Sequence, residues 1–315
     1  MAPSCSSCCS APVASPGRRH SPIDQLLSFL LYLAMTTAVT GVLAMSLNVQ
    51  YGYCGLVNFG QVVFLCVGGY AGGIAATRGV HPLVAVAIAT LLGGVCGWLM
   101  SFTVRGMSGT YWGIVTLATA ELARLVVNNE SWIGGGANGL SVIVRLSYLA
   151  PLIFGSAVSV YLLSMLIVRS PFGRTLRLVR EGDPLALSLG KDIRLFKMQA
   201  MTIGGMMGGL AGCLYAFLNG YISPADCLPI ETFVLWAMVV VGGRGNVTGI
   251  LIGTVVVQTL YVGSRFLTHL VAIPADTLAS LRLVVIGAMI TLMMMFWPDG
   301  VLPERRRIYR IPARD

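Results

Sequence analysis

Charged residues are scarce in this 315-residue chain: Asp, Glu, Lys and Arg make up only 10% of it, whereas 56% is hydrophobic. Soluble domains usually carry about 25% charged residues, so this sequence cannot cover a water-facing surface of ordinary size. Lipid must therefore be its main solvent, and we expect an integral membrane protein. Short alternating strands, the pattern of a transmembrane barrel, are also missing, which predicts an all-α protein.

The sequence also lacks the motifs of common catalytic and nucleotide-binding sites. It has no G-x-x-x-x-G-K-[ST] segment, so ATP binding by a P-loop is excluded. No nucleophile–base pairing stands out. Although 21 basic residues face 12 acidic ones, no stacking aromatic residues are interleaved with them, which argues against nucleic acid. We therefore predict no catalytic residue, no cofactor bound by this chain and no nucleic-acid partner.

The cysteines do not form a convincing metal site. Cys5, Cys8 and Cys9 are close together, but zinc requires four ligands and no further pair lies near them. Four other cysteines lie in apolar segments and are predicted to be small packing residues: Cys54, Cys66, Cys96 and Cys213.

Nine apolar segments are candidates for membrane spans. They are residues 26–47, 62–77, 82–104, 111–127, 149–168, 198–218, 233–243, 250–270 and 281–297. A full helical crossing needs about 20 residues, so the shorter segments predict broken, tilted or re-entrant helices. We expect a polytopic protein with about 8–10 transmembrane helices. Its 38 glycines should allow the helices to approach closely.

The flanking segments suggest a simple domain organisation. Residues 1–24 are rich in Ser, Pro and Ala and predict a disordered tail. Residues 25–302 form the transmembrane domain, and residues 303–315 form a basic tail. The positive-inside rule places that tail and the loop 169–197 in the cytoplasm. Five spans precede the loop, which puts the N-terminus outside, although Arg18 and Arg19 favour the opposite side.

The loop 169–197 concentrates charge in an otherwise apolar chain. It holds seven basic residues, among them both lysines, and three acidic residues. Within it, Leu176 and Val179 alternate with arginines at helical spacing. Asp183 and the proline after it predict a second helix start, and Gly190 predicts its end. Such a short helix suits docking into a partner's groove; alternatively, it rests on lipid headgroups.

Polar residues inside the apolar segments are candidates for a translocation pathway, because polar groups in lipid usually face a cavity or one another. Asn48, Asn58 and Gln61 surround a glycine-rich break and either line a passage or cap the broken helix. Glu121 lies three residues before Arg124, so the two either neutralise each other or mark a pathway. The full candidate set is Asn48, Asn58, Gln61, Tyr70, Thr116 and Glu121. We interpret residues 242–246, G-G-R-G-N, as a tight turn between helices rather than a phosphate site.

Several motifs together resemble one transporter family. The segment RSPFGRTLRLVREGDPLALSLG is similar to the cytoplasmic loop of ABC-transporter permeases of the branched-chain amino acid class, the LivM type. Glu181, Ala186 and Gly190 match that loop's degenerate E-A-A…G signature, whereas Pro184 and Leu185 depart from it. Further resemblance lies in LNVQYGYCGLVNFGQVVFLCVGGYAGG, where Gln61 replaces a common histidine, and in GTYWGIVTLATAELARLVVNN, GGGANGL, NGYISPADC, VVVGGRGNVTGILIG and FWPDGVL.

The resemblance implies a membrane permease subunit of an ATP-driven importer for branched-chain or other amino acids, in the bacterial plasma (inner) membrane. It implies four kinds of partner besides membrane lipid: a second, LivH-like permease subunit, two ABC ATPase subunits that use ATP and Mg, and an extracytoplasmic solute-binding protein. The implied ATPase-coupling residues are Arg180, Glu181, Asp183, Ala186, Leu189 and Gly190. Three alternatives stay open: a urea or short-amide ABC permease, an ion-coupled secondary transporter, and a structural membrane protein without a transported ligand.

Overall fold

The computed structural model describes residues 22–103, 109–142, 148–270, 275–296 and 300–302. Except for residues 22–24, where the first helix has already begun, the two predicted tails lie outside these residues. The helices are α1 (Pro22–Leu47), η1 (Asn48–Tyr53), α2 (Val62–Thr77), α3 (Pro82–Thr103), α4 (Gly109–Asn129), α5 (Ser131–Gly134), η2 (Gly136–Asn138), α6 (Leu149–Arg169), α7 (Pro171–Glu181), α8 (Asp183–Ser188), α9 (Ile193–Asn219), η3 (Pro224–Cys227), α10 (Pro229–Gly242), α11 (Val247–Leu270) and α12 (Ala275–Phe296). Two short strands, β1 (Leu140–Ser141) and β2 (Tyr221–Ile222), pair antiparallel.

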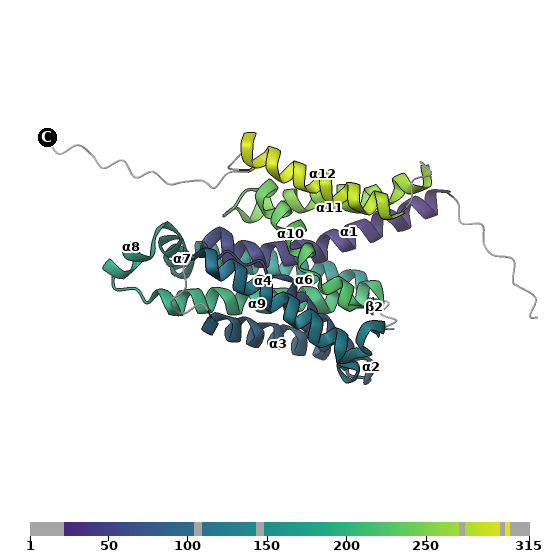
Figure 1. The fold of residues 1–315 in the computed structure, drawn as a ribbon, viewed down its shortest axis with the longest axis horizontal. Helices are drawn as coiled ribbons and strands as arrows, with labels where there is room; N and C mark the ends of the chain where they lie inside the picture. The colour runs from purple at the N-terminus through teal and green to yellow at the C-terminus, as the bar shows by residue number, and fades with distance from the viewer. Residues whose placement is uncertain (1–21, 104–108, 143–147, 271–274, 297–299, 303–315) are drawn as a thin grey trace, which may run out of the picture.

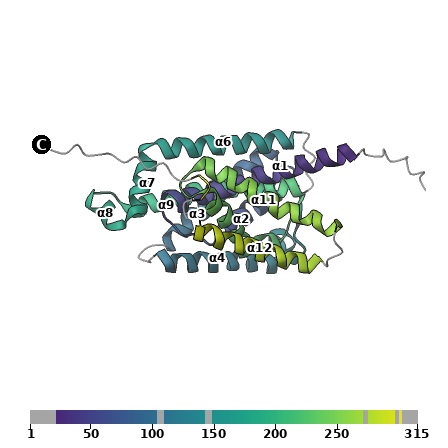
Figure 2. The same cartoon turned by 90° about the horizontal axis from the view of Figure 1, so that it is seen from above.

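The long helices give the body two distinct ends. In the described part of the chain, nine helices of 14 to 27 residues dominate the fold. Helices α7 and α8 lie at one end, whereas β2 and the start of α1 lie at the opposite end (Figures 1 and 2). Four described helices are long and apolar enough to cross a membrane, and three shorter apolar ones accompany them. The prediction of an all-α, polytopic membrane protein is confirmed.

Each of the nine predicted apolar segments overlaps one of the nine long helices. The segment 233–243 overlaps α10, which starts earlier, at Pro229, because proline suits the first helical turn. The predicted break after the first span is also present: α1 continues as the buried π-helix η1 through Tyr53 before the chain leaves the helix. Such π-segments occur often at functional sites.

Glycines bring α2, α3 and α9 into backbone contact. A Cβ atom added to Gly209 of α9 would lie 2.4 Å from the carbonyl oxygen of Ala89 on α3. On the other side of α9, a Cβ on Gly212 would lie 2.1 Å from the carbonyl oxygen of Leu65 on α2. These three helices therefore form a tightly packed centre of the kind that small residues permit in membranes.

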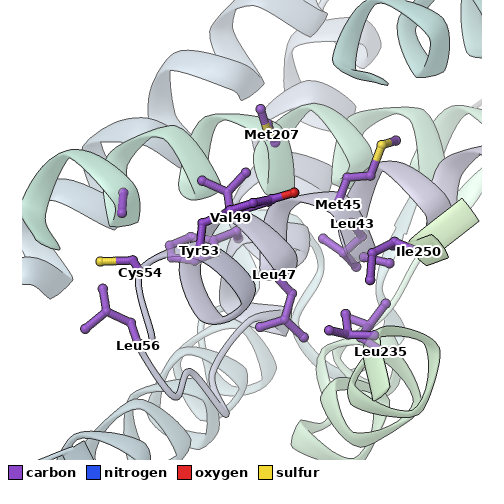
Figure 3. Packing of buried hydrophobic residues seen from close by; sticks show 14 of the residues in the cluster. Leu43, Met45, Leu47, Val49, Tyr53, Cys54, Leu56, Met207, Leu235 and Ile250 are labelled. Atoms are coloured by element: carbon purple, nitrogen blue, oxygen red, sulfur yellow. The ribbon is translucent and has the colours of Figure 1, made fainter. Parts of the chain in front are cut away.

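The end of α1 and η1 lie at the core of the body. Figure 3 shows Val49 and Tyr53 beneath Met207 of α9, while Leu235 of α10 and Ile250 of α11 pack on the other side. All five side chains are at most 4% exposed. A movement of η1 must therefore displace side chains of at least three other helices, because such cores are close-packed.

One sequence prediction about cysteine is wrong. Cys66 of α2 is not a simple packing residue but forms a disulfide with Cys227 of η3. The partner lies 161 residues away along the chain, so spacing alone gave no signal for the pair. Cys54, Cys96 and Cys213 are free thiols in the described structure, with Cys54 and Cys213 buried.

Candidate coupling and translocation site

Buried amides close the break between η1 and α2. The Asn58 side-chain Nδ2 donates to Gln50 Oε1 at 2.7 Å and to Gln61 Oε1 at 3.1 Å. Gln61 Nε2 donates to Ser46 Oγ at 2.6 Å, and Ser46 Oγ donates to the Gly204 carbonyl of α9 at 2.6 Å. All four side chains are fully buried, so these bonds supply partners that water cannot. We call Ser46, Gln50, Asn58 and Gln61 the amide network.

Backbone groups freed by the break are satisfied from several helices. Asn58 Oδ1 accepts from the Gly60 amide at 2.8 Å, and Thr116 Oγ1 of α4 accepts from the Phe59 amide at 3.1 Å. Thr232 Oγ1 of α10 accepts from the Val62 amide at 3.2 Å. The Asn58 contact corresponds to the second role considered at the break, capping a broken helix, whereas the Gln61 side chain makes no capping bond and belongs to the amide network. Ser46, Gln50 and Thr232 were not predicted, because they gain their role only from contacts across the fold.

Asn48 links η1 to the turn between α10 and α11. Its Oδ1 accepts from the Gly245 amide at 3.0 Å, and Tyr53 OH donates to the Gly245 carbonyl at 2.6 Å. The predicted tight turn at residues 242–246 is confirmed, and its Gly243 and Gly245 have positive φ angles of 99° and 79°. The first and last residues of η1, Asn48 and Tyr53, are therefore both hydrogen-bonded to Gly245.

Two pathway candidates lie away from the break. Glu121 and Arg124 form a bidentate ion pair along α4, with the Arg124 Nε 3.0 Å from both carboxylate oxygens. The Glu121 side chain is 42% exposed, so this pair faces outward on the described chain. Tyr70 is buried beside Gly134, and its hydroxyl has no hydrogen-bond partner among the described residues. Neither position contacts the amide network through a hydrogen bond in the described structure.

Helix α7 joins the charged loop to the break. Ser170 accepts from the Gly173 amide at 3.3 Å and so caps α7, whose Leu176 and Val179 are buried in the body. On the same helix, the Arg180 guanidinium donates to the carbonyl of Gly52 in η1. The Arg177 guanidinium lies 5.5 Å from the ring centroid of Tyr53, a cation–π distance. Arg180, predicted as a partner-facing residue, thus turns inward.

Helix α8 confirms the predicted second helix of the loop but differs from it in two details. Asp183 was predicted to cap the helix, yet its carboxylate makes no capping bond and pairs with Lys197 of α9 at 2.9 Å. Ala186 is fully buried and holds α8 against the body. The helix ends at Ser188, two residues before the predicted Gly190, which has a φ of 67°.

The outward surface of α8 is apolar. Leu185, Leu187 and Leu189 are 50%, 62% and 61% exposed, and the Glu181 side chain is 66% exposed at the end of α7. Sequence analysis selected only Leu189 of these leucines. A triplet of exposed leucines is unusual for a water-facing helix of six residues and suits an apolar groove or a lipid surface.

Together, a multi-helix apolar body, an interrupted first helix and a protruding loop tied to that interruption define a polytopic membrane transport protein. The family model described as branched-chain amino acid transport system / permease component matches residues 29–294. The chain belongs to this family, whose members are transport permeases.

Relatives support the same assignment. The high-affinity branched-chain amino acid transport system permease protein LivM of Escherichia coli strain K12 is 28% identical, over 87% of this chain and 70% of its own length. The probable LivM permease of Methanocaldococcus jannaschii is 27% identical, over 90% of this chain and 94% of its own length. The probable LivH permease of the same organism is 25% identical over 71% of this chain and 78% of its own length.

Proposed function

We propose that this chain is the membrane subunit of an ATP-driven importer of branched-chain amino acids, and that α8 receives motion from a separate ATPase. The observation that carries the proposal is the connection of the loop to the break. Helix α8 exposes apolar side chains outward, while Arg180 on the adjoining α7 donates a hydrogen bond to the Gly52 carbonyl in η1. A loop that merely joined two spans would not need a buried contact with an interrupted helix. The names of the relatives supply the substrate class.

The proposal includes the partners that the family resemblance implies. These are a second permease subunit similar to LivH, two ABC ATPases that bind ATP and Mg, an external solute-binding protein and surrounding lipid. This chain binds no cofactor in the proposal and performs no hydrolysis itself. The similarity to a LivH permease agrees with two related membrane subunits facing one another.

Two features support a cytoplasmic location for α7 and α8. The loop carries seven of the chain's Lys and Arg residues, as the positive-inside rule requires. In addition, η3, which follows β2 from the opposite end of the body, holds the Cys66–Cys227 disulfide. Disulfides persist mainly on the oxidising side of a cell membrane. The two arguments use different chemistry and give the same orientation.

Lysine labelling tests the orientation. Lys191 is exposed beside α8, and the other lysine, Lys197, is paired with Asp183. An amine reagent that cannot cross membranes should modify Lys191 only after intact cells are permeabilised, with Lys191→Arg as the control for signal at this site. Modification of Lys191 in intact cells would contradict the cytoplasmic assignment.

Reconstituted vesicles test the function and the docking role. Leucine uptake by the assembled transporter should depend on ATP and persist when ionophores abolish ion gradients; uptake that follows an ion gradient would reject the proposal. Gly190 has open space around a hypothetical Cβ, so a substitution there acts through its positive φ. Gly190→Val should distort the end of α8 and reduce ATPase co-purification, whereas Gly190→Asn, which tolerates this conformation, should preserve it. Equal co-purification with both variants would argue against docking through α8.

Two matched substitutions test the link between α7 and η1. Arg180→Gln removes the charge-assisted bond to Gly52, while Arg174→Gln removes an exposed charge of the same loop. Bonds to charged groups contribute about 1.5–3 kcal/mol. We expect Arg180→Gln to retain ATP hydrolysis but lose most ATP-dependent uptake, and Arg174→Gln to behave like the unmodified transporter. Equal uptake by the two variants would remove Arg180 from the mechanism.

A further inference from the structure

A cavity of about 370 Å³ opens between α1, α9, α10 and α11, and none of the residues predicted for the pathway lines it. Its size lies in the range of small-molecule sites, about 300–1,000 Å³. The cavity runs from the tyrosine-rich ends of the helices near β2 down to Val62, the residue that follows Gln61 of the amide network. It therefore leads from the proposed outer side to the break.

The deep half of the cavity is apolar. Val39 and Leu43 of α1, Leu65 of α2 and Leu235 and Met238 of α10 line it. Each of these side chains is less than 8% exposed, so they form a fixed wall rather than a loose surface. A branched aliphatic side chain is the kind of group that such a wall accepts through burial of apolar surface.

The shallow half carries a carboxylate that the described chain does not neutralise. Asp226 Oδ1 accepts from Tyr215 OH at 2.9 Å, and its Oδ2 accepts from the Ser223 amide and hydroxyl, both at 2.8 Å. In the part of the chain that the structure describes, neither Arg nor Lys contacts Asp226. Glu231 lines the same half, where its Oε1 accepts from Tyr261 OH at 3.1 Å. An ionised carboxylate has about four acceptor sites, so Asp226 retains capacity for a further donor.

A second, independent observation is the side chain of Gln258 on α11. It is only 5% exposed and lines the cavity, yet its amide makes no hydrogen bond within the described residues. Buried amides normally have partners because leaving one unmade costs about 1–3 kcal/mol. Because the Gln258 amide has no hydrogen bond to the described residues and is not one of the fully buried unpaired groups, it faces the open cavity and can bond to a polar group of a ligand there.

We propose that this cavity is a binding site for an apolar amino acid on its way through the membrane subunit. The ammonium group of the amino acid lies against Asp226, its polar end also engages Gln258, and its aliphatic side chain fills the apolar half. This inference rests on the proposed function. It adds the site in the membrane subunit that receives the solute after the external binding protein releases it.

Two threonines on α1 provide a matched test. Thr40 lines the cavity, whereas Thr37, one turn away, lines an apolar groove on the other side of α1 between α6 and α11. Both hydroxyls bond only to their own helix backbone, so a cysteine at either position should fold. Thr40→Cys and Thr37→Cys transporters in vesicles are treated with a methanethiosulfonate reagent, with and without L-leucine, and compared with the unmodified chain as background.

The proposal predicts that L-leucine slows modification at Thr40→Cys and has no effect at Thr37→Cys. Leucine without its ammonium, 4-methylpentanoate, should not protect. Adding Gln258→Leu to Thr40→Cys should raise the half-protecting leucine concentration by roughly 2–10-fold, the value of one neutral hydrogen bond. Adding Asp226→Asn should raise it by roughly 10–100-fold, because this contact joins two charged groups. No protection by leucine, or equal protection by 4-methylpentanoate, would overturn the site. ATP-dependent uptake measured on the same vesicles reports the proposed function separately, so its loss and the loss of protection are distinguishable.

Discussion

Replacing Gly209 by alanine should destabilise the protein, although alanine is the better helix former. Gly209 lies where α9 crosses α3, and the added Cβ would sit 2.4 Å from the Ala89 carbonyl oxygen and 2.9 Å from the Gly93 Cα. Both are backbone atoms, which cannot rotate away. Restoring ordinary contact at about 3.5 Å requires the helices to separate by roughly 1 Å. The reciprocal contacts of Gly93 and Gly205 would be lost in the same movement, because each of these glycines would place a Cβ 2.4 Å from the other's carbonyl oxygen.

The magnitude follows from two opposing effects. Overpacking of a close-packed site costs about 1–3 kcal/mol, while the gain from replacing glycine within a helix is about 0.5–1 kcal/mol. The net effect should be destabilising at Gly209. Gly155 of α6 offers the matched control, since nothing lies within 4 Å of its hypothetical Cβ. There only the helix-propensity gain remains, so Gly155→Ala should be neutral or stabilising.

Thermal inactivation in one detergent measures both variants under identical conditions. We expect Gly209→Ala to lose its folded fraction at a lower temperature than the unmodified chain, and Gly155→Ala to match or exceed it. If Gly209→Ala proved as stable as Gly155→Ala, the close approach of α3 and α9 would be refuted. The helix content of both variants, read by circular dichroism, should be unchanged, because the effect arises from packing and not from helix formation.

Three further predictions concern single contacts. In an oxidising buffer, Cys66→Ser should lower the free energy of unfolding by about 2–4 kcal/mol, because it opens the long loop that the disulfide with Cys227 closes. In a reducing buffer the variant and the unmodified chain should be equally stable. Thermal inactivation with and without reductant measures both effects. Replacing Glu121 and Arg124 together by glutamine should leave ATP-dependent uptake near its normal rate, because the pair is outward and self-contained; a large loss in the vesicle assay would restore Glu121 as a pathway residue. Gly55→Ala should reduce uptake more than ATP hydrolysis, because Gly55 has a φ of 73° and its Cβ would lie 3.1 Å from Arg180 Cγ; parallel uptake and hydrolysis rates test this.

The long helices could be predicted from the sequence because a helix in lipid requires a long stretch of apolar residues. Each apolar segment overlaps a helix, and the charged loop formed two short helices, the second of which is followed by Gly190 with a φ of 67°. What could not be read was which polar groups meet. Gln50 looks like any residue near a break, and only the fold places it within 2.7 Å of Asn58. The disulfide and the strand pair could not be predicted for the same reason. Two-residue strands and cysteines 161 residues apart leave no periodic pattern in the sequence.

The residues proposed for coupling show a second limit of prediction from motifs. Arg180 and Ala186 are both among the coupling residues that the resemblance implies, yet both face the body, whereas Leu185 and Leu187 form the outward surface. A family signature mixes residues that build the loop with residues that contact a partner, because both are required for the same function. Separating them needs the burial of each side chain, which spacing in a helix of six residues does not fix.

The position of the amide network suggests how a small displacement of α7 can reach the cavity. Four hydrogen bonds connect Ser46, Gln50, Asn58, Gln61 and the Gly204 carbonyl, and each net bond contributes about 0.5–1.5 kcal/mol. Breaking them together therefore costs roughly 2–6 kcal/mol, the size of the free-energy gap between two populated conformations of a protein. Arg180 donates a hydrogen bond to Gly52 near the end of η1. Val62, which lines the deep end of the cavity, is the residue that follows Gln61 of the amide network in the sequence. In the proposed mechanism, a pull of α7 on Gly52 would thus act on the layer between the cavity and the end of the body that carries α7 and α8. The network would resist that pull until the proposed ATPases supplied the free energy that breaks its bonds.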